Sequence, residues 1–369
     1  MSKPVRWGIL GTGAIAHGFA QGLRVVPDAR LAAVASRSAA NARAFAQQYG
    51  NPRAHASYAE LVRDPEVDII YVATPHHRHA EDCLLVIEHG KAVLCEKPFA
   101  VNAQQTRMVI EAARRKQVFC MEAMWMRFIP AIRKAHALVS SGAIGEVRML
   151  SADFGVNHQF NPQSRFFDPH LAGGALLDLG VYPIALASLI LGDPQQITTQ
   201  AARGSTGVDD QSAVILSYPG GKLAVLSASL RTWSPQEAVI MGSKGRIHIQ
   251  APFYRPSRLT LIRQAEVPSS TGGQPSSGRQ LQARLERIPL LGGLVEPAKG
   301  VLKQALGRGK RVLKLPLTGN GYNYEASEAM RCLRAGLIES PLMPLDETLR
   351  IMETLDQVRA SWGLRYPGE

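Results

Sequence analysis

The sequence is poor in cysteine and in acidic residues, and it has no long apolar run. Only four cysteines occur in 369 residues, and no two of them form a C-x-x-C pair. This scarcity argues against a disulfide scaffold or a zinc framework and predicts reduced cysteines in a cytoplasmic protein. No apolar run reaches the roughly 20 residues of a membrane span. We therefore expect a soluble chain.

The 46% hydrophobic and 20% charged residues are ordinary for a globular protein, and the length predicts two domains. The net charge of +12 permits binding to nucleic acid or an anionic membrane. However, the basic excess is concentrated in one segment: residues 279–314 contain nine basic and only two acidic residues. A stretch rich in proline, glycine and serine, 266–278, precedes this segment and is typical of a flexible loop.

Short apolar runs alternate with helical stretches through about residue 125. This alternation is typical of βαβ units and predicts an α/β domain with a doubly wound parallel sheet. The predicted strands are 5–10, 31–35, 68–73, 92–95 and 118–121. Three helices are predicted between these strands. The first ends near residue 25, and the other two span 79–89 and 103–116.

The pattern changes after about residue 145, where turn signals separate short alternating segments. It predicts an α+β domain with an open, mostly antiparallel sheet. The predicted strands are 146–154, 195–203, 211–218, 222–230, 237–241 and 245–250, and the predicted helices are 174–191, 322–337 and 346–362. We place the domains at 1–125 and 126–369, with a basic insertion at about 266–318.

A glycine-rich turn follows the first predicted strand. It has the pattern G-x-G-x-x-A and comprises Gly11, Thr12, Gly13, Ala14, Ile15 and Ala16. The first glycine allows a tight turn, and the second lets the backbone approach a pyrophosphate at the N-terminus of the next helix. Since a strand precedes the turn and a helix follows it, the motif predicts a dinucleotide site.

The end of the second strand distinguishes the two nicotinamide dinucleotides. An NAD site usually has a carboxylate there for the ribose 2′-hydroxyl. This chain has Ser36 and Arg37 instead, and a guanidinium pairs well with a 2′-phosphate. The pattern therefore favours NADP(H), and a solvated arginine in a loop is the alternative.

Three further residues are candidates for proton transfer. Lys97 follows the strand 92–95, so it should lie beyond the carboxyl end of the sheet, where ligands bind. From spacing alone, a surface lysine is equally favoured. Asp178 and Tyr182 are four apart in an apolar helix and share a face. A buried structural pair and a proton-transfer site both explain them.

Several motifs together resemble the Gfo/Idh/MocA oxidoreductases. They are the glycine turn, Glu96-Lys97-Pro98 and the stretch 173–183 with sequence GGALLDLGVYP. The segments 122–128 and 339–346 resemble the branch of dimeric dihydrodiol dehydrogenase and NADP-dependent D-xylose 1-dehydrogenase. The likeness covers about 1–265 and 319–369. It implies an N-terminal Rossmann domain and a C-terminal α+β domain whose open sheet forms a homodimer.

The resemblance also implies roles for the candidate residues. Tyr182 becomes the proton donor and acceptor, with a pKa that Lys97 lowers toward neutral, and Asp178 orients the substrate hydroxyl or balances Lys97. Trp125, Arg127 and Phe154 are expected at the substrate. Phe253 and Tyr254 contact either the substrate or the core.

The ends of the predicted strands 68–73 and 92–95 supply further expected cofactor contacts: Thr74, Pro75, His79, Glu96 and Lys97. For His79, a solvated helix start is the competing interpretation. His76 and His77 also invite a metal interpretation, but no carboxylate or cysteine completes such a site nearby. We expect no metal.

The resulting prediction is an NADP-dependent oxidoreductase that acts on a carbinol carbon of a sugar, such as C1 of an aldose, or of a cyclic trans-diol. One alternative is an NADPH-dependent reductase of a sugar ketone or aldehyde, and another is a non-catalytic NADP-binding sensor. The basic segment 279–315 has amphipathic helical spacing. A peripheral surface insertion, a lid or oligomer contact, and a membrane or nucleic-acid contact all remain open for it.

Overall fold

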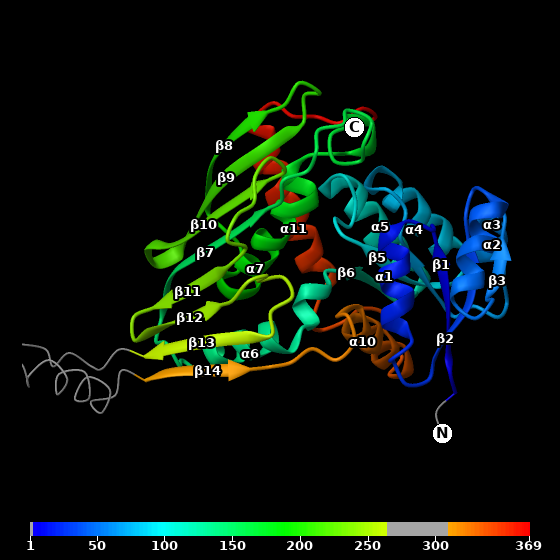
Figure 1. Ribbon diagram of the computed structural model, residues 1–369, viewed down its shortest axis with the longest axis horizontal. Coiled ribbons are helices and arrows are strands. Elements are labelled where there is room, and N and C mark those ends of the chain that lie inside the picture. The colour runs from blue at the N-terminus through cyan, green and yellow to red at the C-terminus, as the bar shows by residue number, and fades with distance from the viewer. Residues whose placement is uncertain (1–2, 264–308) are drawn as a thin grey trace, which may run out of the picture.

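The computed structural model of the chain describes residues 3–263 and 309–369. Figure 1 shows two layered domains side by side, each built on one sheet. The first sheet has six strands, all parallel, and the second has eight, mostly antiparallel. The predicted fold class is confirmed.

The first sheet has the strand order β3-β2-β1-β4-β5-β6. Its strands are β1 (Val5–Leu10), β2 (Ala29–Ala35), β3 (Arg53–His55), β4 (Ile69–Val72), β5 (Ala92–Glu96) and β6 (Cys120–Ala123). Every residue of β4 and β5 is buried, because helices cover both faces of a parallel sheet. The order reverses between β1 and β4, the position at which such sheets bind ligands.

The helices of this domain connect successive strands. They are α1 (Ala14–Leu23), α2 (Ala39–Gln48), α3 (Tyr58–Val62), η1 (His76–Arg78), α4 (His79–Glu88) and α5 (Ala103–Lys116). A short 3-10 helix, η2 (Trp125–Phe128), and α6 (Pro130–Ser140) lead into the second domain. Sequence reasoning left out β3, α2, α3 and α6, because β3 has only three residues and the helices lack long apolar stripes.

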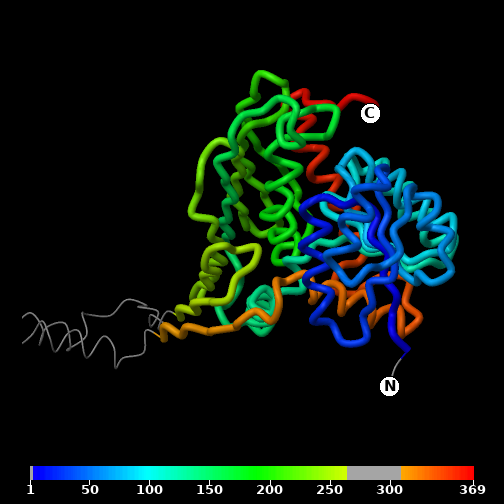
Figure 2. The backbone as a smooth tube through the Cα atoms, turned by 45° about the vertical axis from the view of Figure 1, so that its right-hand side comes forward, coloured from blue at the N-terminus to red at the C-terminus, as the bar shows by residue number. Residues whose placement is uncertain are grey.

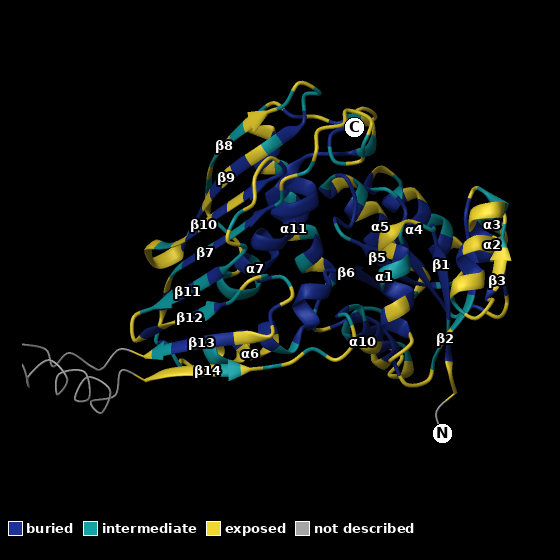
Figure 3. Ribbon diagram, viewed as in Figure 1, coloured by how far each residue is buried: buried dark blue, intermediate teal, exposed yellow. Residues whose placement is uncertain are grey.

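The second sheet has the order β14-β13-β12-β11-β7-β10-β9-β8. Its strands are β7 (Val147–Gly155), β8 (Gln196–Arg203), β9 (Asp209–Tyr218), β10 (Lys222–Ser229), β11 (Ala238–Gly242), β12 (Gly245–Ile249), β13 (Arg258–Arg263) and β14 (Lys310–Lys314). Alternate residues of β9 and β10 are buried, so one face packs on the core and the other is exposed (Figure 3).

Two helical segments in series cover the inner face of this sheet. Residues Leu176–Gly180 form a π-helix, η4, which continues directly into α7 (Val181–Leu191). The helical stretch Pro169–Leu191 is long and apolar enough to cross a membrane. This finding contradicts the expectation that the chain has no apolar run of that length. Most of this stretch is buried inside the protein, as in the core helix of a soluble protein.

The C-terminal helices return to the first domain. Helix α10 (Tyr322–Arg334) packs on α1, and α11 (Leu345–Ala360) packs on both α5 and α7 (Figures 1 and 2). Gly18 and Gly22 allow the close approach of α10, since a Cβ at Gly22 would lie 2.9 Å from the Cβ of Tyr322. The division of the chain at residue 125 stays a prediction.

Most of the basic segment 279–315 lies outside the described residues. Its described end forms β14, which pairs with β13 at one edge of the second sheet. Lys310, Arg311 and Lys314 are exposed there. Charged side chains of this kind protect a sheet edge from pairing with another chain.

Candidate active site

The glycine turn between β1 and α1 forms an open cradle. Gly11 has a φ of +104°, and a Cβ there would lie 2.7 Å from the carbonyl oxygen of Ala73. Glycine is therefore required at this position. Gly13 caps α1, and nothing lies within 4 Å of its missing Cβ. The free N–H groups of the helix end thus face open space, as a pyrophosphate requires.

A cavity of about 640 Å³ lies over this turn. Its lining includes every predicted cofactor residue: Gly11, Thr12, Gly13, Ala14, Ile15, Ser36, Arg37, Thr74, Pro75, His79, Glu96 and Lys97. These residues come from the ends of β1, β2, β4 and β5, which meet at one edge of the sheet. Sequence reasoning missed further lining residues, namely Asn41, Tyr58, Ala73, His76, Arg165, Phe166 and Leu171.

The end of β2 presents hydroxyl and guanidinium groups to this cavity. The Oγ atoms of Thr12 and Ser36 lie 3.5 Å apart, and Arg37 is exposed beside them. The Ser38 side chain caps α2 by accepting from the N–H of Asn41. No carboxylate lines the described cavity at this end, so the electrostatics suit a phosphate on the ribose.

Lys97 joins the two domains at the inner end of the cavity. Its Nζ donates to the carbonyl oxygen of Asp178 at 2.7 Å and lies 3.3 Å from the Asp178 Oδ1. Lys97 follows β5 of the first domain, whereas Asp178 belongs to η4 of the second. The same Nζ lies 4.8 Å from the centre of the Tyr182 ring, a cation–π contact.

Asp178 is a buried carboxylate with three cationic or polar neighbours. Its Oδ1 accepts from Arg165 Nη1 at 3.0 Å and lies 3.8 Å from His76 Nε2. Burial alone would raise the pKa of Asp178, but the charges of Lys97 and Arg165, together with the nearby His76 and the Arg165 hydrogen bond, outweigh burial and lower it well below its ordinary value. Asp178 is therefore ionised at any physiological pH.

The hydroxyl of Tyr182 accepts a hydrogen bond from Trp125 Nε1 at 2.8 Å. The expectation that Lys97 lowers the pKa of Tyr182 is wrong for this arrangement. Burial raises the pKa well above its ordinary value, and Tyr322 and Glu96 add to the effect, which the Trp125 hydrogen bond only partly opposes. The ammonium group of Lys97 lies over the ring and donates to Asp178, so it does not reach the phenol oxygen.

Aromatic rings surround Tyr182. Phe154 stacks on Tyr254 with ring centres 4.5 Å apart, and both contact Tyr182, at 5.4 and 5.6 Å. Trp125 stacks on Tyr322 at 4.8 Å. Tyr254 thus belongs to the aromatic cluster, whereas the fully buried Phe253 belongs to the core.

Two acids and a phenol lie buried behind Lys97. Glu96 accepts hydrogen bonds from the Tyr71 hydroxyl and from the backbone N–H of Lys97. Glu325, on α10, is fully buried, and neither of its carboxyl oxygens has a partner among the described residues. Burial, with the charge of Glu96, raises the pKa of Glu325 well above its ordinary value, so Glu325 is protonated.

The histidines after β4 are largely internal. His79 is fully buried, so its predicted alternative as a solvated helix start is wrong. Its Nε2 lies 2.8 Å from the Thr74 carbonyl oxygen, and its Nδ1 lies 2.7 Å from the Pro98 carbonyl oxygen. The ring therefore links the ends of β4 and β5. Burial lowers the pKa of both His79 and His76, so both rings are neutral. Within the described ranges, no cluster of histidine, cysteine or carboxylate side chains is arranged to hold a metal.

Arg127 does not belong to this site. Its buried guanidinium forms a bidentate ion pair with Glu347, at 2.5 and 2.7 Å, and donates to the Leu342 carbonyl oxygen. It lines a different cavity, so the expectation that it contacts the substrate is corrected. The resemblance implied a substrate contact for Arg127. Its partner Glu347 is 220 residues away in sequence, so the ion pair left no local signal.

The other expected substrate residues lie outside the lining of this cavity. Trp125, Phe154, Asp178 and Tyr182 are buried and do not line the cavity that the glycine turn, Glu96 and Lys97 form. Arg165, which is partly exposed, separates Asp178 from the open space.

Asp209 anchors the segment that carries Asp178. Its Oδ2 accepts from the backbone N–H of Leu176, the first residue of η4, at 2.7 Å. Its Oδ1 has no partner among the described residues and would lie 2.3 Å from a Cβ at Gly174. Burial, with a smaller contribution from Asp210, raises the pKa of Asp209 to about 7.

The glycine cradle, the arginine at the second strand and the paired Lys97 and Asp178 define a dinucleotide-dependent oxidoreductase. Two family models match the chain. The oxidoreductase family with an NAD-binding Rossmann fold matches residues 5–124, and the GFO/IDH/MocA C-terminal domain matches residues 132–248. The chain belongs to the GFO/IDH/MocA oxidoreductases. Its first domain is an NAD(P)-binding Rossmann domain, and it is an enzyme that acts on CH–OH groups.

Several relatives are similar over the full length. Trans-1,2-dihydrobenzene-1,2-diol dehydrogenase from Danio rerio is 35% identical over 98% of both chains. The protein of that name from Homo sapiens is 33% identical, again over 98% of both chains.

Two solved structures share the fold at low identity. An aldose-aldose oxidoreductase from Caulobacter crescentus, crystallised with glycerol, superposes with a TM-score of 0.78 at 22% identity, covering 98% of this chain and 99% of that chain. A 3-ketoreductase from Actinomadura kijaniata, in complex with NADP and TDP-benzene, has a TM-score of 0.77 at 23% identity, covering 97% and 98%.

The position of Asp209 predicts a pH-dependent contribution to stability. Because its pKa rises from 3.8 unfolded to about 7 folded, its contribution is greatest below pH 4 and is lost as the pH rises to 7. Asp209→Asn keeps an acceptor for Leu176 but cannot titrate. We expect the free energy of unfolding of Asp209→Asn, relative to the native protein, to rise by up to roughly 4 kcal/mol between pH 4 and 8.

Denaturant titrations at pH 4, 6 and 8 measure this difference. Glu111→Gln, which removes an exposed carboxylate from α5, controls for the change in net charge. Parallel pH profiles for Asp209→Asn and the native protein would contradict the prediction.

Proposed function

We propose that this protein is an NADP-dependent oxidoreductase that interconverts a secondary alcohol and a carbonyl group on a cyclic trans-1,2-diol. The class includes carbocyclic dihydrodiols and aldopyranoses, whose C1 and C2 hydroxyls can be trans on a six-membered ring. The observation that carries the proposal is the contact of Lys97 with Asp178, beside Tyr182 and at the inner end of the dinucleotide cavity.

The residues divide the proton chemistry between them. When bound, the nicotinamide accepts the hydride that leaves the carbinol carbon. In its phenolate form Tyr182 takes the hydroxyl proton and becomes a neutral phenol, and the Trp125 N–H stabilises the phenolate that precedes this transfer. Lys97 supplies a positive charge over the Tyr182 ring, and the ionised Asp178 fixes its ammonium group. The buried aromatic cluster excludes water from this path.

The preference for NADP(H) rests on the end of β2. Arg37 and Ser36 line the cavity where a ribose 2′-substituent would lie, and no carboxylate lines it there among the described residues. A 2′-phosphate gains charge-assisted hydrogen bonds from the guanidinium, whereas a ribose hydroxyl gains little.

The substrate class rests on the aromatic rings and on the relatives. Trp125, Phe154 and Tyr254 form an aromatic cluster against which one face of a ring would pack once a substrate enters, while Tyr182 and Lys97 would supply polar atoms to its hydroxyls. The full-length relatives are named as dehydrogenases of a trans-diol. An aldopyranose presents the same pair of hydroxyls, so both substrates belong in the first tests.

The reductive direction is a second candidate for the physiological reaction. The raised pKa of Tyr182 favours the neutral phenol, which is the state that donates a proton to a carbonyl oxygen. Reduction of a sugar ketone or aldehyde with NADPH therefore needs no prior deprotonation of Tyr182. Initial rates in both directions with the same diol and ketone pair decide between the two.

We also propose a homodimer through the exposed face of the second sheet. A row of paired residues crosses four neighbouring strands on this face. It consists of Ile215 on β9, Val225 on β10, Ser151 on β7 and Val239 on β11. Ile215, Val225 and the neighbouring Leu223 are large apolar side chains exposed to solvent. Helices α7 and α11 pack on the opposite face, and no described helix covers this one (Figure 1). A second copy of the chain, packed on this face, would bury these apolar side chains.

The proposed compartment is the cytoplasm. All four cysteines, Cys83, Cys95, Cys120 and Cys332, are free and buried, which is the state that a reducing compartment maintains.

Removing the Arg37 guanidinium should weaken NADP(H) binding and leave NAD(H) binding nearly unchanged. Arg37→Ala loses a charge-assisted hydrogen bond, so we expect a loss of about 1.5–3 kcal/mol in NADPH affinity. Fluorescence titration measures this loss, and Arg43→Ala removes another exposed arginine, on α2, as a control. Equal affinity of the native protein for both cofactors would refute the preference.

Tyr182→Phe and Lys97→Met should each lower turnover at least about a hundredfold, the low end for general acid–base catalysis. NADPH affinity should change much less, which shows that the fold and the dinucleotide cavity persist. Tyr218→Phe removes another buried phenol hydroxyl, on β9, and should keep native turnover. The assignment fails if both site variants retain near-native rates on the best diol.

A charge placed on the exposed sheet face should separate the proposed dimer. Val225→Lys introduces two lysines at a two-fold interface, and desolvating an unpaired charge is costly. Light scattering should give the mass of one chain for Val225→Lys and of two chains for the native protein. Met108→Lys, on the exposed face of α5, should remain dimeric. A monomeric native protein at micromolar concentration rules out the proposal.

A further inference from the structure

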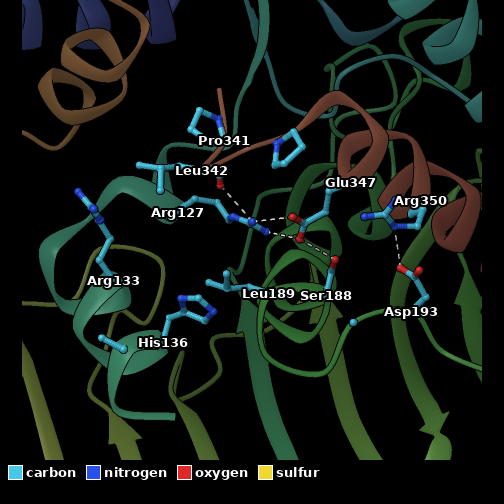
Figure 4. A pocket seen from close by; sticks show the side chains of 13 residues that line it. Arg127, Arg133, His136, Ser188, Leu189, Asp193, Pro341, Leu342, Glu347 and Arg350 are labelled. Atoms are coloured by element: carbon cyan, nitrogen blue, oxygen red, sulfur yellow. Dashed lines mark hydrogen bonds and ion pairs between the residues drawn. The ribbon is translucent and has the colours of Figure 1, made fainter. Parts of the chain in front are cut away.

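A second cavity, of about 500 Å³, lies apart from the dinucleotide cavity. It is bounded by α6, the end of α7 and the start of α11, and we refer to it as the α6 cavity (Figure 4). It shares no lining residue with the cavity at the glycine turn. Its volume is within the range of small-molecule sites.

Both carboxylates that line the α6 cavity are already paired. Glu347 forms the bidentate pair with Arg127 and also accepts from the Ser188 hydroxyl at 2.9 Å. Asp193 lies 2.9 Å from Arg350 Nε. Figure 4 marks both ion pairs with dashed lines. Because each acid has an arginine partner, neither repels an entering anion strongly.

Two basic side chains on the wall of the α6 cavity have no such partner. Arg133 and His136 are three residues apart on α6, so they lie on one face of the helix. Both are exposed, and neither side chain forms a hydrogen bond or ion pair with any residue in the ranges 3–263 and 309–369. The cavity therefore has an uncompensated positive charge and free donors on one wall.

The rest of the lining is apolar. Ala137, Leu189, Pro341, Leu342 and Pro344 also line the cavity. Figure 4 shows Leu189 beside His136. A charged group could bind at Arg133 and His136, while a short carbon chain or ring packs against these apolar residues.

We propose that the α6 cavity binds a small organic phosphate, with its phosphoryl group held by Arg133 and His136. A guanidinium donates two parallel hydrogen bonds to phosphate oxygens, and an imidazole adds a third donor. The site is distinct from the one that binds the dinucleotide. It nevertheless rests on the elements that position the catalytic groups, since η2 carries Trp125 and Arg127, and α7 carries Tyr182 and Ser188.

Calorimetric titration of the NADPH-saturated enzyme tests the proposal, because the cofactor then blocks the phosphate-binding turn. The probes are glycerol 3-phosphate and glucose 6-phosphate, with glycerol as the uncharged comparison. We expect one saturable site per chain for a phosphorylated probe and none for glycerol. No saturable binding of either phosphorylated probe at millimolar concentration would overturn the proposal.

Charge reversal separates a built site from general attraction to a basic protein. Arg133→Glu should weaken binding of the phosphorylated probe at least about tenfold, because it removes the guanidinium and adds repulsion. Lys134→Glu makes the same change in net charge at an exposed neighbour that does not line the cavity, and should change affinity less than about twofold. Equal weakening by both variants would show non-specific attraction and refute the site. An unchanged thermal midpoint and NADPH affinity confirm that each variant is folded.

Discussion

The ionised carboxylate of Asp178 is the point on which the site depends. Lys97 from the first domain and Arg165 from the second both converge on its Oδ1, and His76 lies close by. A buried carboxylate is stable only with such compensation. Because one partner comes from each domain, the same electrostatic balance that keeps Asp178 charged also fixes the position of the second domain against the end of β5.

The acids around this centre are held in different charge states by their surroundings. Asp178 has cationic neighbours and remains ionised, whereas Glu325 has none among the described residues and remains protonated. Glu96 is an intermediate case. Burial raises its pKa, and hydrogen bonds from Tyr71 and the Lys97 backbone oppose that rise. The ammonium group of Lys97 is directed at the ionised Asp178 and not at the protonated Glu325.

The sequence was sufficient where the signal is local. The glycine turn, Arg37 and Lys97 each adjoin a strand whose apolar pattern is unmistakable, and all of them line one cavity. Pairings across the chain left no such signal. Arg127 finds Glu347 far along the sequence, and the π-turn of η4 replaces the α-helical spacing that was assumed between Asp178 and Tyr182. Strands β13 and β14 pair across residues 264–308, so neither one alone indicated the sheet edge.

The return of α10 and α11 to the first domain has a consequence for the way the molecule can be divided. Removing everything after residue 125 would uncover the glycine-containing face of α1 and the side of α5 against which α11 packs. The isolated Rossmann half would then expose apolar surface that is buried in the full chain. The two halves are therefore not interchangeable modules, and a chimaera with another member's substrate domain would have to carry that member's C-terminal helices and a compatible α1 surface as a single unit.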